Sequence, residues 1–136
     1  MNKKEKQAKL IDWMICDDIR MEKNRKLMFI GVYQDNIIVP KIPFVLPMLT
    51  IFTKWDTSES SIQDFEMIVS QPDRKKIGPI IGKLGPKPKD KQKTSIQVTI
   101  SPFQMPITGK YEIVMKVDKK TYKIGCFEVA LAPEKG

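Results

Sequence analysis

The chain has 136 residues, a formal net charge of +8 and no histidine. This length favours a single domain that buries a core without structural disulfides or metals. Histidine-dependent catalysis and most zinc and iron ligand sets are excluded, and two cysteines cannot close a zinc site, so we expect no enzyme, cofactor or metal.

The first third of the sequence is rich in β-forming residues. We expect a strand over 10–16 and then a polar connection over 17–24. The near-continuous apolar run 26–33 predicts a central strand covered on both faces. Gly31 inside this run indicates a bulge or a close backbone approach.

Proline marks the middle of the chain. Pro40, Pro43 and Pro47 follow a short expected strand over 37–39, and the next strand is expected over 48–55. Because proline cannot donate to a sheet ladder, the proline-rich stretch is predicted to be a sheet edge or a crossover between sheets.

Three later segments, 63–70, 94–101 and 110–118, alternate apolar and polar residues, as half-buried antiparallel strands do. A last strand is expected over 121–131, after a hairpin at Lys119-Lys120. The alternation assigns one set of side chains to a shared core: Phe65, Met67, Val69, Ile96, Val98, Ile100, Tyr111, Ile113, Met115 and Val117.

No amphipathic helix of convincing length interrupts these strands. We therefore predict an all-β fold, a single antiparallel β-sandwich of immunoglobulin-like or Greek-key type with seven to eight strands. The expected domain is 10–132, preceded by a basic N-terminal extension over 1–9 and followed by a tail over 133–136. The apolar runs are too short to span a bilayer and no signal peptide is recognised, so the cytoplasm is the expected compartment.

Positive charge is concentrated in the segment 74–93, which we predict to be a long basic loop with at most one short strand near Ile80-Ile81. It holds eight basic residues against Asp90 alone, a net +7 of the formal +8. Each is a candidate binding residue: Arg74, Lys75, Lys76, Lys83, Lys87, Lys89, Lys91 and Lys93.

Several roles for this segment stay open. Its lysines could serve solubility alone, contact an acidic protein surface, bind phosphate backbones nonspecifically or contact an anionic membrane. Base recognition is disfavoured because residues 71–95 contain no Phe, Tyr or Trp. We expect a non-enzymatic binding module that contacts another macromolecule, foremost a protein with an acidic surface, through sheet edges and the basic segment; a nucleic-acid-associated protein is the alternative.

Other polar and aromatic residues have structural interpretations. Asp17 and Asp18 are neighbours at an expected strand end, where one carboxylate would cap a turn and the other would pair with Arg20 or Arg25. Trp13 and Trp55 are expected to pack in the core. Cys16 and Cys126 are expected to be buried thiols, although a disulfide between the first and last strands is conceivable.

Three stretches together carry a family resemblance. They are Cys16–Arg20 with Lys26-Leu27 and Ile30–Tyr33, then Ile38–Pro40 with Pro43 and Leu46-Pro47, and finally Gly109–Glu112 before a hairpin. In these stretches, within 10–55 and 103–129, the chain resembles a family of uncharacterised bacterial proteins of similar length. The resemblance implies a β-sandwich and an unknown function, and no site residue carries over from it. The basic segment lies outside the resembling regions.

Overall fold

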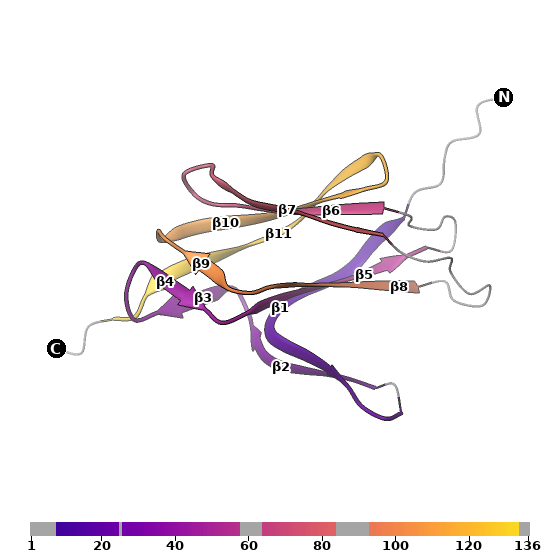
Figure 1. The fold of residues 1–136 in the computed structure, drawn as a ribbon, viewed down its shortest axis with the longest axis horizontal. Helices are drawn as coiled ribbons and strands as arrows, with labels where there is room; N and C mark the ends of the chain where they lie inside the picture. The colour runs from indigo at the N-terminus through magenta and orange to yellow at the C-terminus, as the bar shows by residue number, and fades with distance from the viewer. Residues whose placement is uncertain (1–7, 25, 58–63, 84–92, 134–136) are drawn as a thin grey trace.

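The computed structural model describes residues 8–24, 26–57, 64–83 and 93–133. These residues form an all-β fold without a helix (Figure 1). The strands are β1 (Lys9–Met21), β2 (Leu27–Tyr33), β3 (Asn36–Val39), β4 (Phe44–Leu46), β5 (Leu49–Asp56), β6 (Asp64–Ser70), β7 (Lys76–Lys83), β8 (Lys93–Ile100), β9 (Phe103–Met105), β10 (Gly109–Val117) and β11 (Lys120–Leu131).

The strands of the described residues belong to three sheets. One sheet has the order β2-β1-β5-β8, a second has the order β3-β11-β10-β6-β7, and β4 pairs with β9 in a small third sheet. All pairs are antiparallel except β3 with β11, which are parallel. The all-β class is confirmed, whereas the expectation of one purely antiparallel sandwich with seven to eight strands was too simple: the described residues form eleven strands in three sheets.

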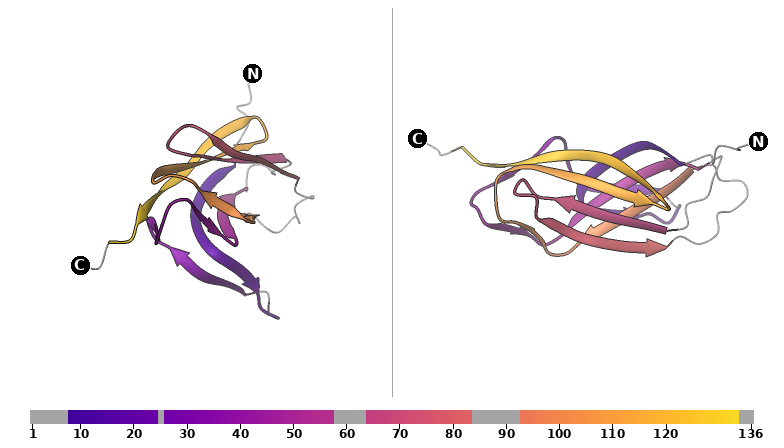
Figure 2. Two further views of the ribbon diagram at one scale, coloured as in Figure 1. Left: turned by 60° about the vertical axis from the view of Figure 1, so that its left-hand side comes forward. Right: turned by 90° about the horizontal axis from the view of Figure 1, so that it is seen from above.

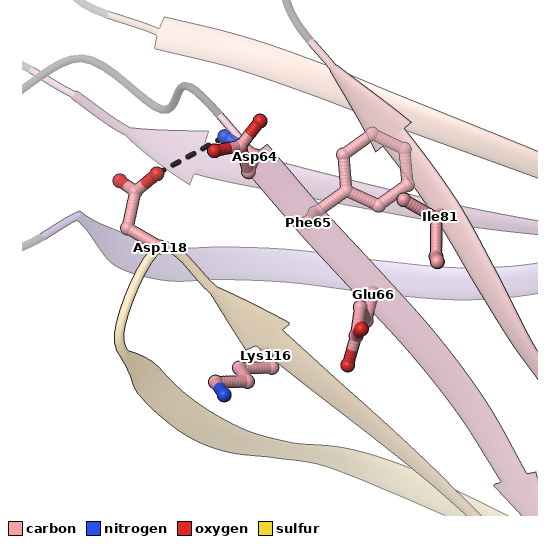
Figure 3. Close-up of a pocket in the computed structure, with 6 residues that line it drawn as sticks. All are labelled: Asp64, Phe65, Glu66, Ile81, Lys116 and Asp118. Carbon is pink, nitrogen blue, oxygen red and sulfur yellow. Dashed lines mark hydrogen bonds between the residues drawn. The ribbon is translucent and has the colours of Figure 1, made fainter.

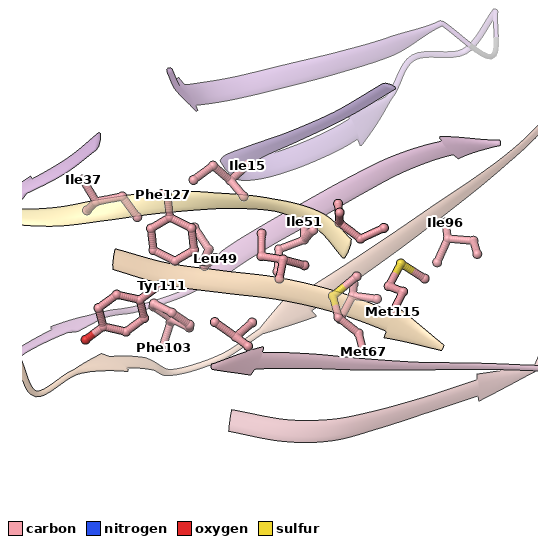
Figure 4. Packing of buried hydrophobic residues seen from close by; sticks show 14 of the residues in the cluster. Ile15, Ile37, Leu49, Ile51, Met67, Ile96, Phe103, Tyr111, Met115 and Phe127 are labelled. Atoms are coloured by element: carbon pink, nitrogen blue, oxygen red, sulfur yellow. The ribbon is translucent and has the colours of Figure 1, made fainter. Parts of the chain in front are cut away.

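The hydrophobic core lies between the two larger sheets (Figures 2 and 4). The alternation predicted for β6, β8 and β10 is confirmed, since nine of the ten assigned core side chains are buried and Ile100 is partly buried. Trp55 is fully buried and Trp13 packs against the core. Alternation predicts these faces well because successive side chains of a strand point to opposite sides of the sheet.

The prolines between β3 and β5 mark a change of sheet, as predicted. The chain leaves the five-stranded sheet after Val39, forms β4, and enters the four-stranded sheet at Leu49. The hairpin between β10 and β11 is also present, with Val117 opposite Lys120. Its two turn residues are Asp118 and Lys119, one position earlier than predicted.

Two predictions at the start of the chain were wrong. Residues 17–21, expected in a polar connection, continue β1 to Met21. The apolar run that we expected to be a central strand is β2, which lies at the edge of the four-stranded sheet. An apolar run indicates burial only where another layer covers both faces, and no described strand covers the outer face of this one.

The prediction of a loop over 74–93 was wrong for residues 76–83, which form β7 and pair with β6. The irregular composition produces an irregular strand: Gly78 has φ +103° and the register with β6 shifts between Met67 and Val69. β7 is an edge strand, where Pro79 can be tolerated because its missing N–H need not face a neighbour. Residues 84–92 lie outside the described part of the chain.

The ends of the domain are partly described. Lys9 begins β1, and Ala8 is buried with its carbonyl accepting a 2.6 Å hydrogen bond from the Tyr122 hydroxyl. The predicted extension is otherwise outside the described residues, as is most of the predicted tail. Across the described ranges, no helix is long and apolar enough to cross a membrane.

Candidate interaction surfaces

The structure divides the predicted basic residues between two places. Arg74 and Lys75 lie in the turn between β6 and β7, and Lys76 begins β7; all three are exposed. The backbone of Lys83 ends β7 and Lys93 begins β8, at the opposite end of the molecule (Figure 2). Lys83 is seven positions after Lys76 along the strand, a distance of about 23 Å. The remaining three candidates, Lys87, Lys89 and Lys91, lie outside the described residues.

A lysine that the sequence analysis missed joins the basic turn. Gly109, the first residue of β10, lies against Pro72, with a Cβ at Gly109 placed only 2.8 Å from the proline ring. The following residue, Lys110, is exposed beside the turn. No local pattern could have indicated this neighbour, because β10 is 36 positions from Arg74 and reaches it only through pairing with β6.

We call Arg74, Lys75, Lys76 and Lys110 the basic corner. Two acids lie beside them: Asp73 in the same turn, whose Oδ1 accepts a 3.2 Å hydrogen bond from the Lys75 backbone amide, and Glu128 of β11, which lies opposite Lys110. Within the described ranges, none of the four cations forms an ion pair. Four exposed cations without ion pairs produce a local positive field that an anionic partner would neutralise.

The second surface lies on the ribbon formed by β2 and the adjoining half of β1, which projects from the body (Figure 1). Cys16, Asp18 and Arg20 of β1 lie opposite Val32, Ile30 and Met28 of β2, respectively. Directly opposite residues share a face, so the three apolar side chains form one row. They are 48%, 37% and 44% exposed, respectively. We call Met28, Ile30 and Val32 the apolar row.

The ribbon is anchored where it joins the body. The ring of Phe29 meets the buried ring of Phe52 edge-on, with centroids 5.1 Å apart. The Tyr33 hydroxyl donates a 2.6 Å hydrogen bond to Oδ1 of Asp17. The same carboxylate covers Gly31, where φ is +67° and a Cβ would overlap it. The predicted close approach at Gly31 is therefore present, with a side chain rather than backbone as the neighbour.

The two neighbouring aspartates have separate structural roles, and one of these roles was expected from the sequence. Oδ2 of Asp18 accepts a 3.2 Å hydrogen bond from Nε of Arg20, so that pairing is confirmed. Asp17 binds Tyr33 and lies within β1 rather than at a strand end. Burial, followed by the charges of Asp17 and Asp18, raises the pKa of the Cys16 thiol, which keeps it protonated and poorly nucleophilic. Cys16 and Cys126 are free thiols, the first buried and the second partly buried.

A shallow pocket of about 260 Å³ opens on the outer face of the five-stranded sheet (Figure 3). Its wall is formed by Asp64, Phe65, Glu66, Ile81, Lys116 and Asp118. Oδ1 of Asp118 accepts a 3.0 Å hydrogen bond from the amide of Asp64, which ties the start of β6 to the β10–β11 turn. Across the described part of the chain, no group of three potential ligands could hold a metal ion.

Comparison with known proteins adds a family but no activity. The model of a family described as "Family of unknown function (DUF6941)" matches residues 11–129. The match spans the basic segment as well as both regions of the resemblance noted above. No curated protein matches the chain.

Proposed function

Because the chain belongs to a family of unknown function, DUF6941, to which no activity is attached, we propose its role from its surface: a non-enzymatic protein-binding module with an acidic partner. The observation that supports this most is the basic corner. Arg74, Lys75, Lys76 and Lys110 come from two different parts of the sequence, are all exposed, and make no ion pairs within the described structure.

The position of the basic corner favours a protein partner. Lys76 is the first residue of the edge strand β7, so a bound acidic segment could meet both the cations and the outer side of a sheet edge. The charges would steer the encounter and select an acidic partner, while the contact with the sheet edge would fix its position. Lys83 and Lys93 lie at the opposite end of the molecule and do not extend this surface, and Lys87, Lys89 and Lys91 lie outside the described residues.

Nonspecific binding of nucleic-acid phosphates is the alternative. It needs the same cations but gains from aromatic rings on which bases stack. Residues 71–95 have no aromatic residue, and Tyr111, the nearest ring along β10, is fully buried. The basic corner therefore fits carboxylates on a protein better than bases on a single strand.

Two further expectations remain part of this proposal. Facing sheets around one core support a β-sandwich scaffold, for which immunoglobulin-like or Greek-key connectivity stays a prediction. The cytoplasm stays the expected compartment.

The test is capture of partners from a lysate of the native host by the full-length chain, with and without nuclease. We expect the captured protein to be retained after nuclease treatment and to be lost when Arg74, Lys75, Lys76 and Lys110 are replaced by glutamate. The matched control replaces Lys23, Lys26, Lys116 and Lys119, which are also exposed, and so changes the net charge by the same amount.

The proposal predicts that only the basic-corner variant loses its partner and that high salt weakens the contact of the parent protein, because exposed charges are screened. Equal losses in both variants would show that only net charge matters. Loss of the partner on nuclease treatment would favour the nucleic-acid alternative.

A further inference from the structure

The turn between β6 and β7 is a three-residue hairpin loop formed by Pro72, Asp73 and Arg74. The amide of Gln71 donates a 2.8 Å hydrogen bond to the carbonyl of Lys75, which closes the hairpin. The amide of Arg74 donates to the carbonyl of Gln71 at 2.9 Å, and Asp73 accepts the bond from the Lys75 amide described above. The last residue of such a loop adopts the left-handed conformation, and glycine suits that position best.

Arg74 occupies this left-handed position, with φ +69°. The conformation is unfavourable for arginine because its Cβ crowds the backbone. One other described non-glycine residue, Asp118, has a positive φ, and there the carboxylate binds the Asp64 amide. The exposed side chain of Arg74, in contrast, makes no hydrogen bond, ion pair or ring contact with the described residues. Backbone strain without a structural reason is characteristic of ligand contacts.

We propose that Arg74 is the specificity-determining residue of the basic corner, and that it binds a carboxylate of an acidic protein segment through two parallel N–H···O bonds. This inference rests on the proposed function, because it assigns the specificity of the same surface. A guanidinium is a planar fork that matches the two oxygens of a carboxylate, whereas a lysine ammonium is a point charge. The three lysines of the corner then supply the field that attracts the partner.

The turn holds Arg74 on a fixed backbone beside a sheet edge. Its own hydrogen bonds and the close approach of Gly109 to Pro72 keep the loop in place. A backbone that is already ordered reduces the entropy lost on binding. Lys76 begins the edge strand β7 two residues later, so a carboxylate bound at Arg74 would lie where the rest of an acidic segment could continue along that edge.

Binding of a short, fluorescently labelled oligoglutamate peptide to the full-length chain, followed by anisotropy, tests this assignment. Arg74→Lys keeps the net charge but removes the fork, so we expect the affinity to fall about threefold to tenfold. The matched control is Arg20→Lys, the same change on the β1–β2 ribbon, where the arginine already pairs with Asp18. This control should bind the peptide as the parent does.

Thermal unfolding separates a recognition residue from a structural one. Glycine and asparagine both accept φ +69°, so Arg74→Gly and Arg74→Asn should raise the unfolding midpoint by about 2–5 °C while weakening peptide binding. Arg74→Ala keeps a Cβ in the left-handed conformation and should therefore weaken binding without raising the midpoint. A lower midpoint in Arg74→Gly would show that the arginine stabilises the fold, and would overturn the proposal.

The remaining outcomes distinguish this assignment from the proposed function. Suppose that Arg74→Lys binds the peptide like the parent, whereas glutamate at all four basic-corner positions abolishes binding. The proposed function would then stand, but Arg74 would not determine its specificity. Equal binding by the parent and the four-residue variant, or no binding by the parent, would contradict both.

A phosphate also fits a guanidinium fork. A single-stranded oligothymidylate is therefore the second probe, measured in the same way. We expect Arg74→Lys to lose more affinity for the peptide than for the oligothymidylate. The opposite result would assign the fork to a nucleic-acid phosphate and overturn the proposal.

Discussion

The hydroxyl of Tyr33 and the carboxylate of Asp17 form a 2.6 Å hydrogen bond that joins β2 to β1 where the ribbon leaves the body. The bond requires a neutral phenol as donor, and Asp17 covers Gly31 in the same place. This hydrogen bond holds the base of the ribbon together, and it is lost if Tyr33 ionises at alkaline pH.

Burial, followed by the hydrogen bond to Asp17, raises the pKa of Tyr33 well above its usual value. Burial also raises the pKa of Tyr111 and Tyr122, so all three tyrosines of the chain are affected. Their contribution to stability is complete below the unfolded pKa of about 10 and is lost as pH rises above it. Absorbance at alkaline pH should show the tyrosines of the folded protein ionising at higher pH than a free phenol does.

Tyr33→Phe separates this residue from the other two. The variant should lose the hydrogen bond to Asp17 and should show a weaker fall in stability above about pH 10 than the parent. Urea unfolding at several pH values provides the measurement. A phenol that titrates normally in the parent protein and is missing in Tyr33→Phe would contradict the structure around Tyr33.

Ile113, at the centre of β10, is fully buried. Ile113→Ala should reduce the free energy of unfolding by about 2–4 kcal/mol, because it removes apolar contacts and leaves a cavity. Gln97→Ala and Thr99→Ala, at exposed positions of β8, should each cost about 0.5 kcal/mol or less. Similar costs at all three sites in urea denaturation would mean that the core is not placed between the sheets as described.

A buried hydrogen bond links two side chains of β5. Nε1 of Trp55 donates to Oγ1 of Thr53 at 2.8 Å, and both residues are fully buried. Thr53→Val keeps the shape but leaves the indole N–H without this acceptor, so it should cost about 1–3 kcal/mol. In a Trp55→Phe background the same change should cost much less, as a double-mutant cycle of unfolding free energies would show.

The two larger sheets also meet where Gly125 of β11 lies under the ring of Trp13. Gly125→Ala would place a methyl group in the ring, so Trp13 must move and stability should fall by about 1–3 kcal/mol. The fluorescence of Trp13, recorded in a Trp55→Phe background, should shift toward that of an exposed indole. With Trp13→Ala already present, Gly125→Ala should be close to neutral.

The sequence by itself determined the core faces of three strands. Alternation in β6, β8 and β10 identified their buried faces because the two-residue period of a strand is a local property of the backbone. The prolines after Val39 likewise identified a change of sheet, since a missing N–H is a local constraint. The absence of histidine and the positions of the basic residues in the chain also follow from the sequence alone.

Only the tertiary structure decided which strands lie at edges and which residues become neighbours. The same apolar run, Leu27–Tyr33, would suit a central strand, but sheet order places it at an edge with the apolar row exposed. The glycines and the proline in 76–83 predicted a loop. In the structure this segment is a strand, because it pairs with β6. Lys110 joins Arg74 through strand pairing alone. Edge position and long-range neighbours depend on how strands assemble, which no local period records.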